Sequence, residues 1–562
     1  MAISCRVCRK AFEDAPEDIA LRSDVAPVLG GKKYDIPPPT LCPDCRALRR
    51  MSWRNERTLY KRTCNATQKS IVSVYSQDKP FIVYENKAWY AGTWDGHDQG
   101  RDIDFTRPFF PQFAELLRAV PHLALSAIGT QNSDYVNQCG WCKNCYLLFE
   151  ADVDQDCMYG NFLYDSKSCV DMLQGKECEL CYECIDCRKC YSLAHSQDCE
   201  NCSSSWFLKN CIGCMDCIAC SNVRNKKHCI WNKQYSEAEY KKMRDDLHLT
   251  SSAAIAKLGE QFSAWIQQFP QRAMHGTQNE DSSGDYLWNT QRCVHCFDLL
   301  DSQDCKYVAS ARNMKKVHDT LVFGAEKGAE FCYENHEVGE GVRGVAFCDQ
   351  LWTSVSNVYY SKLCMENSHD LFGCMGLRHA SYCILNKQYT KEEYERLAGK
   401  LIEHMRSTNE WGEYFSMEMS PFAYNETVAQ EYFPLSEEDV KSRSWKWRDE
   451  EGERIPASQS PSPIPEAIDR TSDDILKSVL RCERCAKAYK IIPQELSFYR
   501  QMNVAVPREC FDCRHLARMA LRNPRKLWNR NCAKCQRDIE TSYAPGRPET
   551  VYCESCYLSA IY

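Results

Sequence analysis

The sequence predicts a mainly β protein with helical segments: a cysteine-rich parallel β-helix (solenoid) in two repeated halves, flanked by small cysteine modules. Three observations predict this fold. Cys-x-x-Cys pairs gather at both ends of the chain, cysteines recur at a fixed spacing through its middle, and two stretches of the middle resemble each other. The chain has 562 residues and 38 cysteines. Chains of this length rarely need disulfides, so we expect metal sites and buried thiols in a reducing compartment.

Twelve of the cysteines form three sets, each made of two Cys-x-x-Cys pairs. The sets are Cys5, Cys8, Cys42 and Cys45; Cys482, Cys485, Cys510 and Cys513; and Cys532, Cys535, Cys553 and Cys556. Two such pairs can close a tetrahedral thiolate cage around Zn²⁺, so we expect three structural zinc sites. Buried thiols, disulfides or a redox pair are the alternatives. A closed cage leaves no open coordination position, so the metal would stabilise the fold rather than catalyse.

The cysteine module occurs twice. Residues 42–64 align with residues 510–532 at a constant offset of 468. In each copy a Cys-x-x-Cys pair runs directly into a predicted helix whose N-terminus favours thiolate over thiol, as in treble-clef and zinc-ribbon sites. In the second ribbon of the N-terminal copy, the four cysteine positions are occupied by Cys64, Thr67, Glu85 and Ala88. We therefore expect that ribbon to keep its shape without a metal, with Cys64 as a lone thiol.

Four arginines of each module recur at i, i+4, i+8 and i+11, on one helix face. They are Arg46, Arg50, Arg54 and Arg57 in the first copy and Arg514, Arg518, Arg522 and Arg525 in the second. The net charge is −7, yet residues 481–531 hold twelve Lys/Arg against four Asp/Glu, and residues 46–62 hold seven against one. Basic ends on an acidic body make these arginines candidate contacts to nucleic-acid phosphates. A solvated, solubilising helix face is the alternative.

Between about residues 139 and 229 the cysteines keep a 21-residue period. One column consists of Cys157, Cys178, Cys199 and Cys220. Repetition with short, turn-rich segments predicts a parallel β-helix with one coil for each 21-residue repeat. Five cysteines from Cys178 to Cys190 fall every third residue, but the spacing and proline of a ferredoxin cluster motif are missing.

A weaker second copy of this region follows. "HCIWNKQYSEAEY" (228–240) matches "YCILNKQYTKEEY" (382–394), and on this alignment Cys217 becomes Leu371. Leucine cannot bind a metal, whereas it can replace a small buried side chain. We therefore expect the central thiols to fill the core, and additional zinc or an iron–sulfur cluster is the alternative.

Two capping boxes predict helices that cover the open ends of the solenoid halves. They are formed by Ser236 with Glu239 and by Thr390 with Glu393, and start helices over about 236–268 and 390–408. The expected organisation is an N-terminal zinc module with a degenerate second ribbon (1–120), two solenoid halves with capping helices (121–269 and 270–449), a flexible Pro/Ser-rich linker (450–474) and a C-terminal double zinc ribbon (475–562).

Several motifs together resemble a known group of proteins. They are "CMGLRHASYCILNKQYTKEEYERL" (374–397), "SPFAYNETVAQEYFPL" (420–435) and the tandem terminal ribbons. The chain resembles uncharacterised cysteine-rich zinc-ribbon proteins of candidate-phylum bacteria such as Parcubacteria, over nearly its whole length. Members are often labelled CaiB/BaiF (CoA-transferase) proteins, but the chain lacks both an alternating βαβ pattern and a site that matches that chemistry. The resemblance implies the architecture and no particular activity.

The sequence favours a zinc-binding, non-enzymatic scaffold or adaptor protein, because a solenoid offers a broad surface and zinc modules are common adaptors. Binding of RNA or the ribosome through the basic zinc modules is the alternative. An enzyme site in the solenoid is a third hypothesis, with candidates His195, His228, His295, His318, His336 and His369. No small-molecule substrate is evident. With no signal peptide and no apolar run of about 18 residues, we expect a cytoplasmic protein that contacts no membrane.

Overall fold

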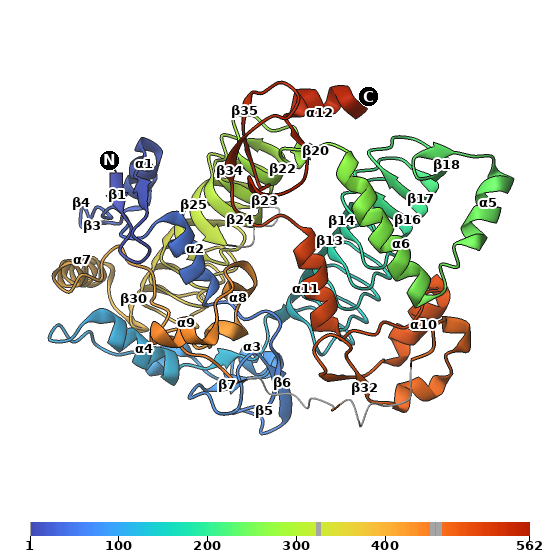
Figure 1. Cartoon of the computed structure of the whole chain (residues 1–562). Coiled ribbons are helices and arrows are strands. Elements are labelled where there is room, and N and C mark those ends of the chain that lie inside the picture. The colour runs from blue at the N-terminus through green and yellow to red at the C-terminus, as the bar shows by residue number, and fades with distance from the viewer. Residues whose placement is uncertain (1, 322–326, 450–455, 457–463, 562) are drawn as a thin grey trace.

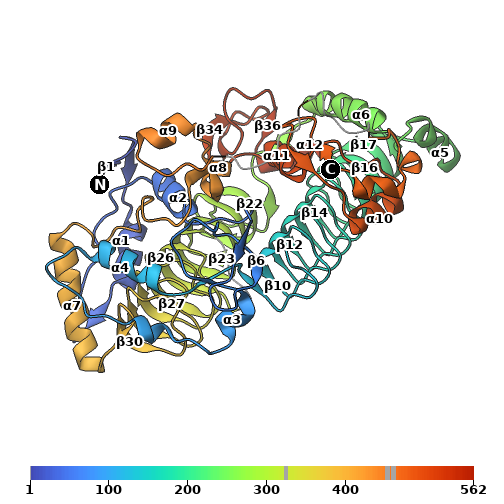
Figure 2. The same cartoon turned by 90° about the horizontal axis from the view of Figure 1, so that it is seen from below.

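The structure is a computed structural model that describes residues 2–321, 327–449, 456 and 464–561. It is rich in sheet and also carries helices, and most of its strands lie in two stacks of parallel strands (Figure 1). The two stacks lie side by side, and helices α2 (Pro43–Met51) and α11 (Phe511–Leu521), from opposite ends of the chain, lie along the same side of them (Figure 2).

The first stack is built from short strands in two sheets. They are β9 (Ala127–Ile128), β10 (Asn137–Gly140), β11 (Phe149–Asp152), β12 (Asn161–Tyr164), β13 (Leu173–Lys176), β14 (Ile185–Arg188), β15 (Tyr191–Ala194), β16 (Ser203–Lys209), β17 (Met215–Ser221), β18 (Lys227–Ile230) and β19 (Lys233–Gln234). One sheet runs from β9 to β14 and the other from β15 to β19, and isolated parallel bridges such as Glu179–Tyr191 and Ile185–Gln197 connect them. Register partners in the parallel pairs of this stack differ by 12 in residue number, as Cys139 with Ala151 and Ala151 with Leu163 do. The last pair, β18 with β19, is antiparallel.

The second stack repeats the parallel pairing with some longer strands. Its strands are β21 (Gly276–Thr277), β22 (Gly284–Gln291), β23 (Cys296–Gln303), β24 (Lys306–Arg312), β25 (Met314–Leu321), β26 (Ala329–His336), β27 (Val342–Ala346), β28 (Ser356–Tyr359), β29 (His369–Phe372), β30 (Ser381–Ile384) and β31 (Lys387–Gln388). Strands β22 to β26 are the longer ones, with seven or eight residues each. Its register partners differ by 12 in residue number between β22 and β23, and by 13 between β27 and β28. It also ends in an antiparallel pair, β30 with β31.

A three-residue pattern runs through both stacks. Every third residue is left-handed, for example Gln138 (φ 59°), Trp141 (φ 50°) and Asn144 (φ 55°). The side chain of the residue directly after each left-handed residue points into the stack. Cys139 and Cys142 are two such residues, and both are buried. Each left-handed non-glycine residue costs roughly 1 kcal/mol, and hydrogen bonds to the neighbouring strands offset this cost.

The predicted 21-residue coil is therefore wrong, because neighbouring strands pair at an offset of 12. Both 21 and 12 are multiples of the three-residue unit. Cysteines separated by the predicted period, such as Cys157 and Cys178, are consequently both buried inside the stack, but they do not stand in one register column. The sequence pattern identified the inward positions and gave the wrong length for the repeat.

The interior of the first stack consists largely of sulfur. The Sγ atom of Cys139 lies 3.3 Å from the carbonyl oxygen of Asn137 and 3.4 Å from that of Leu148, and Cys157 makes the equivalent pair of contacts. In the second stack, burial raises the pKa of the Cys364 thiol to about 12. These contacts favour neutral core thiols over the additional metal ligands considered from the sequence.

The two ends of the chain contain the same order of elements, except that the N-terminal strands β3 (Val28–Leu29) and β4 (Lys32–Lys33) have no counterpart among the described residues of the C-terminal end. The N-terminal elements are β1 (Ala2–Ser4), β2 (Ala11–Glu13), α1 (Pro16–Val25), β3, β4, α2, β5 (Tyr60–Thr63), β6 (Ser70–Ser73), β7 (Val83–Tyr84) and α3 (Asn86–Tyr90). The C-terminal elements are β32 (Leu480–Arg481), β33 (Ala488–Tyr489), α10 (Pro493–Met502), α11, β34 (Trp528–Asn531), β35 (Asp538–Thr541), β36 (Val551–Tyr552) and α12 (Glu554–Ile561). From α2 and α11 onward, the elements of the two copies start at the offset of 468.

Each end adds a strand to the segment that leads into a stack. Strand β7 pairs in parallel with β8 (His122–Leu123), just before the first stack. Strand β36 pairs in the same way with β20 (Gln271–Arg272), just before the second stack. The N-terminal module is thus joined by strand pairing to the first stack, and the C-terminal module to the second.

The two predicted capping boxes are present. The side chain of Ser236 accepts a hydrogen bond from the Glu239 backbone N–H before α5 (Glu237–Asp246), and Thr390 and Glu393 repeat this before α7 (Lys391–Ser407). Further helical elements are η1 (Gly96–Gln99), α4 (Phe109–Ala119), α6 (Ser252–Trp265), η2 (Ile266–Gln268), η3 (Tyr424–Glu426), α8 (Val428–Tyr432), α9 (Glu437–Ser442), η5 (Ile468–Arg470) and η6 (Asp473–Lys477). Within the described residues, no helix combines the length and the apolar character needed to cross a membrane.

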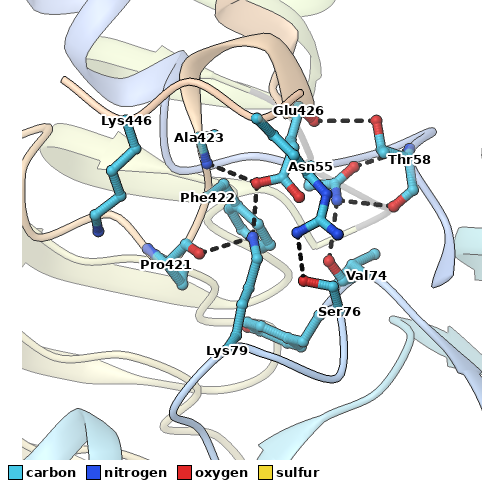
Figure 3. Close-up of polar contacts among 12 residues, drawn as sticks. Asn55, Thr58, Val74, Ser76, Lys79, Pro421, Phe422, Ala423, Glu426 and Lys446 are labelled. Atoms are coloured by element: carbon cyan, nitrogen blue, oxygen red, sulfur yellow. Dashed lines mark hydrogen bonds and ion pairs between the residues drawn. The ribbon is translucent and has the colours of Figure 1, made fainter. Parts of the chain in front are cut away.

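The segment after the second stack folds back onto the N-terminal module (Figure 3). At its centre, the Glu426 carboxylate accepts hydrogen bonds of 2.6 Å from Lys79 Nζ and from the Ala423 backbone N–H. Most of the predicted linker at 450–474 lies outside the described residues. Its last part is described, and Ile468 is buried there.

Replacing a central cysteine tests whether these thiols are core side chains. We expect Cys217→Val to shift the free energy of unfolding by less than about 1.5 kcal/mol, because the swap keeps an apolar side chain of similar size. Cys217→Asp should destabilise the stack by at least about 3 kcal/mol, because it buries a charge without a partner. Urea unfolding followed by circular dichroism measures both. A fall in bound metal in the valine variant would contradict the core interpretation.

Candidate metal centres and buried arginine rows

The structure brings together the four sulfur atoms of each predicted set. Within the sets that begin at Cys5, Cys482 and Cys532, all four Sγ atoms lie within 4.8 Å of one another. Individual sulfur–sulfur distances are 3.5 Å for Cys8–Cys42, 3.7 Å for Cys485–Cys510 and 3.7 Å for Cys535–Cys553. A tetrahedral zinc site with Zn–S bonds of about 2.3 Å has sulfur–sulfur edges of about 3.8 Å. The three cages therefore have the ligand type and the size that Zn²⁺ requires.

A tight turn positions the first cysteine pair of each set. The residue four places after its first cysteine is left-handed in every case: Arg9, Ala486 and Gln536. The turn aims the backbone N–H groups of Arg484 and Cys485 at Cys482 Sγ, and the Cys510 N–H of the second pair lies 3.3 Å from the same sulfur. Burial raises the pKa of Cys482, but the N–H groups of Cys485, Cys510 and Arg484 outweigh it and lower this pKa to about 7. The backbone thus favours the thiolate that binds metal.

The degenerate ribbon keeps this geometry around a single thiol. The Glu85 backbone N–H lies 3.3 Å from Cys64 Sγ, just as the Cys553 N–H lies 3.2 Å from Cys532 Sγ in the other copy. Cys64 is a free, buried thiol. Because Thr67, Glu85 and Ala88 bring no second sulfur, the ribbon retains the turn and the strands of a metal site without its ligand set.

The arginine face of α2 points into the second stack. Arg46 Nη2 lies 2.8 Å from Asp319 Oδ2, and Arg50 Nη2 lies 3.4 Å from Asp319 Oδ1. Arg49, which was outside the predicted set, lies 2.8 Å from Glu334. All five side chains are buried. The helix is therefore attached to β25 and β26 by ion pairs that are shielded from solvent.

The same row continues beyond the helix and reaches both stacks. Arg54 Nη2 lies 3.0 Å from Glu150 of the first stack, and Nη1 lies 3.4 Å from Glu337, just after β26 of the second. Its Nε donates to Glu56. Arg57 completes the row, with 9% of its side chain exposed. One guanidinium group thus joins the module and the two stacks.

Helix α11 attaches the C-terminal module to the first stack. Arg514 Nε and Arg518 Nη1 lie 2.8 Å and 3.0 Å from the two oxygens of Asp171. Arg518 also lies 3.1 Å from Glu183, which follows Asp171 at the offset that separates neighbouring strands. The four side chains form a ladder in which Arg514, Arg518 and Asp171 are buried and Glu183 is 17% exposed, and carboxylates one offset apart share the arginines of one helix.

The last two arginines of this row also reach both stacks. Arg522 Nε lies 2.8 Å from Asp186 of the first stack, and its Nη2 donates to Asp298 of the second. Arg525 Nη2 lies 2.9 Å from the other oxygen of Asp298. A single carboxylate therefore holds two guanidinium groups where the two stacks meet.

The eight arginines predicted as nucleic-acid contacts are all engaged within the chain, and their binding to nucleic acid stays a prediction. Every one of the eight predicted arginines has less than a tenth of its side chain exposed and lies against a carboxylate or another protein group. A phosphate would have to displace those partners and open the contact between module and stack. The arginine rows bind the chain to itself.

Sequence reasoning missed the partners of these arginines. The partners that lie in the two stacks are Glu150, Asp171, Glu183, Asp186, Asp298, Asp319, Glu334 and Glu337, and every one of these is left-handed. This position points outward next to an inward side chain. An acidic residue directly before an inward residue of the three-residue pattern was the signal that could have identified them.

Three of the six histidines considered for an enzyme site have structural surroundings. His318 Nδ1 lies 3.1 Å from Asp18 Oδ1, and His336 Nδ1 lies 2.5 Å from Asp349 Oδ1, with both histidines buried. Burial lowers the pKa of His195 to about 4. A neutral, half-buried His195 is suited to packing rather than to proton transfer at neutral pH.

Matched serine variants at equivalent ribbon positions test the metal assignment. We expect Cys532→Ser to remove one zinc ion per chain and to unfold the second C-terminal ribbon, because binding of structural zinc supplies folding free energy. Cys64→Ser should leave the zinc content unchanged. Native mass spectrometry counts the metal, and limited proteolysis locates the unfolded segment. Equal loss of zinc in the two variants would contradict the assignment.

Acidification tests the contact at Asp298. Burial raises the pKa of Asp298, but Arg522 and Arg525 outweigh it and lower this pKa to about 2, below the value of about 3.9 expected for an unfolded chain. Its stabilising contribution is therefore complete above about pH 4 and disappears as the pH falls toward 2.

We expect Asp298→Asn to destabilise the protein by about 3 kcal/mol at pH 7, because it leaves two buried guanidinium groups without their shared partner. The difference from the original chain should shrink between about pH 4 and pH 2. Unfolding midpoints of the variant and of the original chain across this pH range measure the difference in stability. The titration of the cage cysteines affects both proteins equally and therefore cancels in this difference. A constant difference would contradict the role of Asp298.

Comparison with known proteins does not assign the chain to a family. No protein-family model matches the chain, and no curated protein matches it either. The resemblance to cysteine-rich proteins of candidate-phylum bacteria therefore stays a prediction. What the chain does has to be inferred from its three thiolate cages and its buried arginine rows.

Proposed function

We propose that the chain is a zinc-dependent, non-enzymatic scaffold or adaptor protein, in which two terminal zinc modules lock two β-solenoid halves together and present them to a macromolecular partner. One observation carries the proposal: Arg54 and Arg522, related by the offset of 468, each contact carboxylates of both stacks. Their partners are Glu150 with Glu337 and Asp186 with Asp298, respectively. Equivalent arginines of the two modules thus each connect the first stack to the second.

The modules are attached crosswise, which supports a locking role. The N-terminal module pairs β7 with the segment before the first stack and inserts the arginines of α2 into the second. The C-terminal module pairs β36 with the segment before the second stack and inserts the arginines of α11 into the first. Removing either module would leave buried carboxylates without partners, which costs several kcal/mol.

The three-residue pattern and the parallel register support a solenoid interpretation of each stack. Four three-residue units make up the 12-residue offset, so one coil would have four short sides around a thiol core. Helices α5 and α7 would cover the last coils and prevent pairing with another edge. The exposed flanks of such a solenoid form a broad, rigid surface suited to a protein partner.

The alternative, RNA or ribosome binding through the zinc modules, loses its main support because the eight arginines are engaged within the chain. Capture experiments separate the two functions. A partner that stays on the zinc-loaded chain after nuclease treatment, and is lost from the zinc-free chain, supports the scaffold function. A partner released by ribonuclease overturns it in favour of RNA.

Zinc removal tests the lock directly. We expect a chelator to unfold the terminal modules and release the two stacks, so that the radius of gyration measured by small-angle X-ray scattering rises by roughly a tenth or more. Circular dichroism should keep most of its β signal, because the stacks contain their own cores. An unchanged radius in zinc-free protein would show that the modules do not hold the stacks together.

A further inference from the structure

We propose that the cleft between the two stacks is a binding site for an organic cation, an ammonium or guanidinium group carried on an alkyl chain. The inference rests on the proposed function, since the zinc modules set the distance between the stacks. The cleft has a volume of about 390 Å³ and receives side chains from both stacks and from Arg54 of the N-terminal module. Pockets of this size hold small ligands or a single side chain of a partner.

One wall of the cleft is a register column of the first stack. Ile128, Gly140, Asp152 and Tyr164 follow one another across β9 to β12. Gly140 keeps the column open, because a Cβ atom there would come within 2.3 Å of Asp152 Oδ1. The wall therefore offers a carboxylate beside an aromatic ring.

The floor of the cleft carries more negative than positive charge. Arg54 is surrounded by three carboxylates, those of Glu56, Glu150 and Glu337. The complete lining has five carboxylates and two guanidinium groups: Glu150, Asp152, Asp165, Glu337 and Glu340 against Arg54 and Arg312. Burial raises the pKa of Asp152 to about 6, with only partial compensation by Arg312, and burial also raises the pKa of Glu150 well above its usual value, with only partial compensation by Arg54. An added cation would relieve this excess of negative charge.

Two buried oxygens of the floor have no hydrogen-bond donor among the described residues. Glu150 is 4% exposed, and its Oε2 accepts from Arg54 at 3.0 Å, while Oε1 accepts no hydrogen bond. Glu337 is 5% exposed, and its Oε1 accepts from Trp352 Nε1, while Oε2 has only the ion-pair contact of 3.4 Å with Arg54. A buried carboxylate oxygen without a donor is costly. The N–H groups of a cation are the donors that would satisfy both.

Aromatic rings at the cleft favour an organic cation over a metal ion. Trp141, on the first stack, is 61% exposed although it is a large apolar side chain. Trp352 lines the cleft from the second stack, and Tyr90 and Tyr164 also line it. The face of an aromatic ring attracts ammonium and guanidinium groups and packs against their alkyl chains. A neutral or anionic ligand would leave the carboxylate excess in place.

Calorimetric titration of the full-length, zinc-loaded chain tests the site. The probes are agmatine, which carries a guanidinium and an ammonium group, a short lysine–glycine peptide, and neutral 1,4-butanediol. We expect the two cations to bind and the diol not to bind. Tighter binding of agmatine would indicate a free amine as the natural source of the cation, and tighter binding of the peptide would indicate a protein side chain.

Three variants place the binding in the cleft. Glu150→Gln keeps the shape of the side chain and should weaken binding about tenfold, because it removes one charge partner. Trp141→Ala should weaken binding roughly fivefold, because it removes an aromatic ring from the cleft. The side chain is exposed, so we expect this variant to fold as the original chain does. Glu177→Gln, an exposed position of the same stack outside the cleft, is the matched control and should bind as the original chain does.

The proposal is overturned if neither cation binds at millimolar concentration, if Glu150→Gln and Trp141→Ala bind as tightly as the original chain, or if Glu177→Gln loses binding equally. All these measurements use zinc-loaded protein with intact modules. Failure of the cation site would therefore leave the lock and the scaffold function standing, whereas failure of the lock would appear in the scattering experiment without zinc.

Discussion

Buried ion pairs between arginines and carboxylates determine how this molecule is assembled. Moving a guanidinium group and a carboxylate out of water is costly, and the contact is stable only when both partners are present with good geometry. The two arginine rows meet this requirement by inserting into the stacks, with Arg54 and Arg522 reaching both stacks at once. Because each row grows out of a cysteine cage, the position of the guanidinium groups depends on the integrity of that cage.

The three-residue pattern supplies what the arginines need. It turns one side chain inward, and it holds the preceding residue in a left-handed conformation whose side chain faces outward next to the core. Carboxylates at this position, such as Asp171 and Glu183, repeat at the offset that separates neighbouring strands. The tight interior leaves room for small side chains, which explains why thiols fill it. Core composition and surface charge thus follow from one backbone pattern.

These features combine into one functional picture. Zinc would keep the terminal modules rigid, and the modules would hold the stacks at a fixed distance. That distance would define the cleft, in which one carboxylate oxygen each of Glu150 and Glu337 lacks a hydrogen-bond donor among the described residues. A scaffold of this kind could present its flanks to a partner while the cleft takes up a cationic group. The basic ends, which from the charge pattern alone pointed to nucleic acid, are neutralised by the acidic body of the same chain.

Local pattern was enough to identify some features and not others. Paired Cys-x-x-Cys motifs, the offset of 468, the lone thiol of Cys64 and the capping boxes at Ser236 and Thr390 could be predicted, because each depends on residues close in sequence or on an internal copy. The register of the strands, the partners of the arginines and the cleft could not. Each is decided by tertiary contacts between segments that are far apart in the sequence. Arg522, for example, contacts Asp186 and Asp298, which lie hundreds of positions away. Because these contacts bury the arginine side chains, a helix face that looks solvent-exposed in the sequence becomes an internal contact.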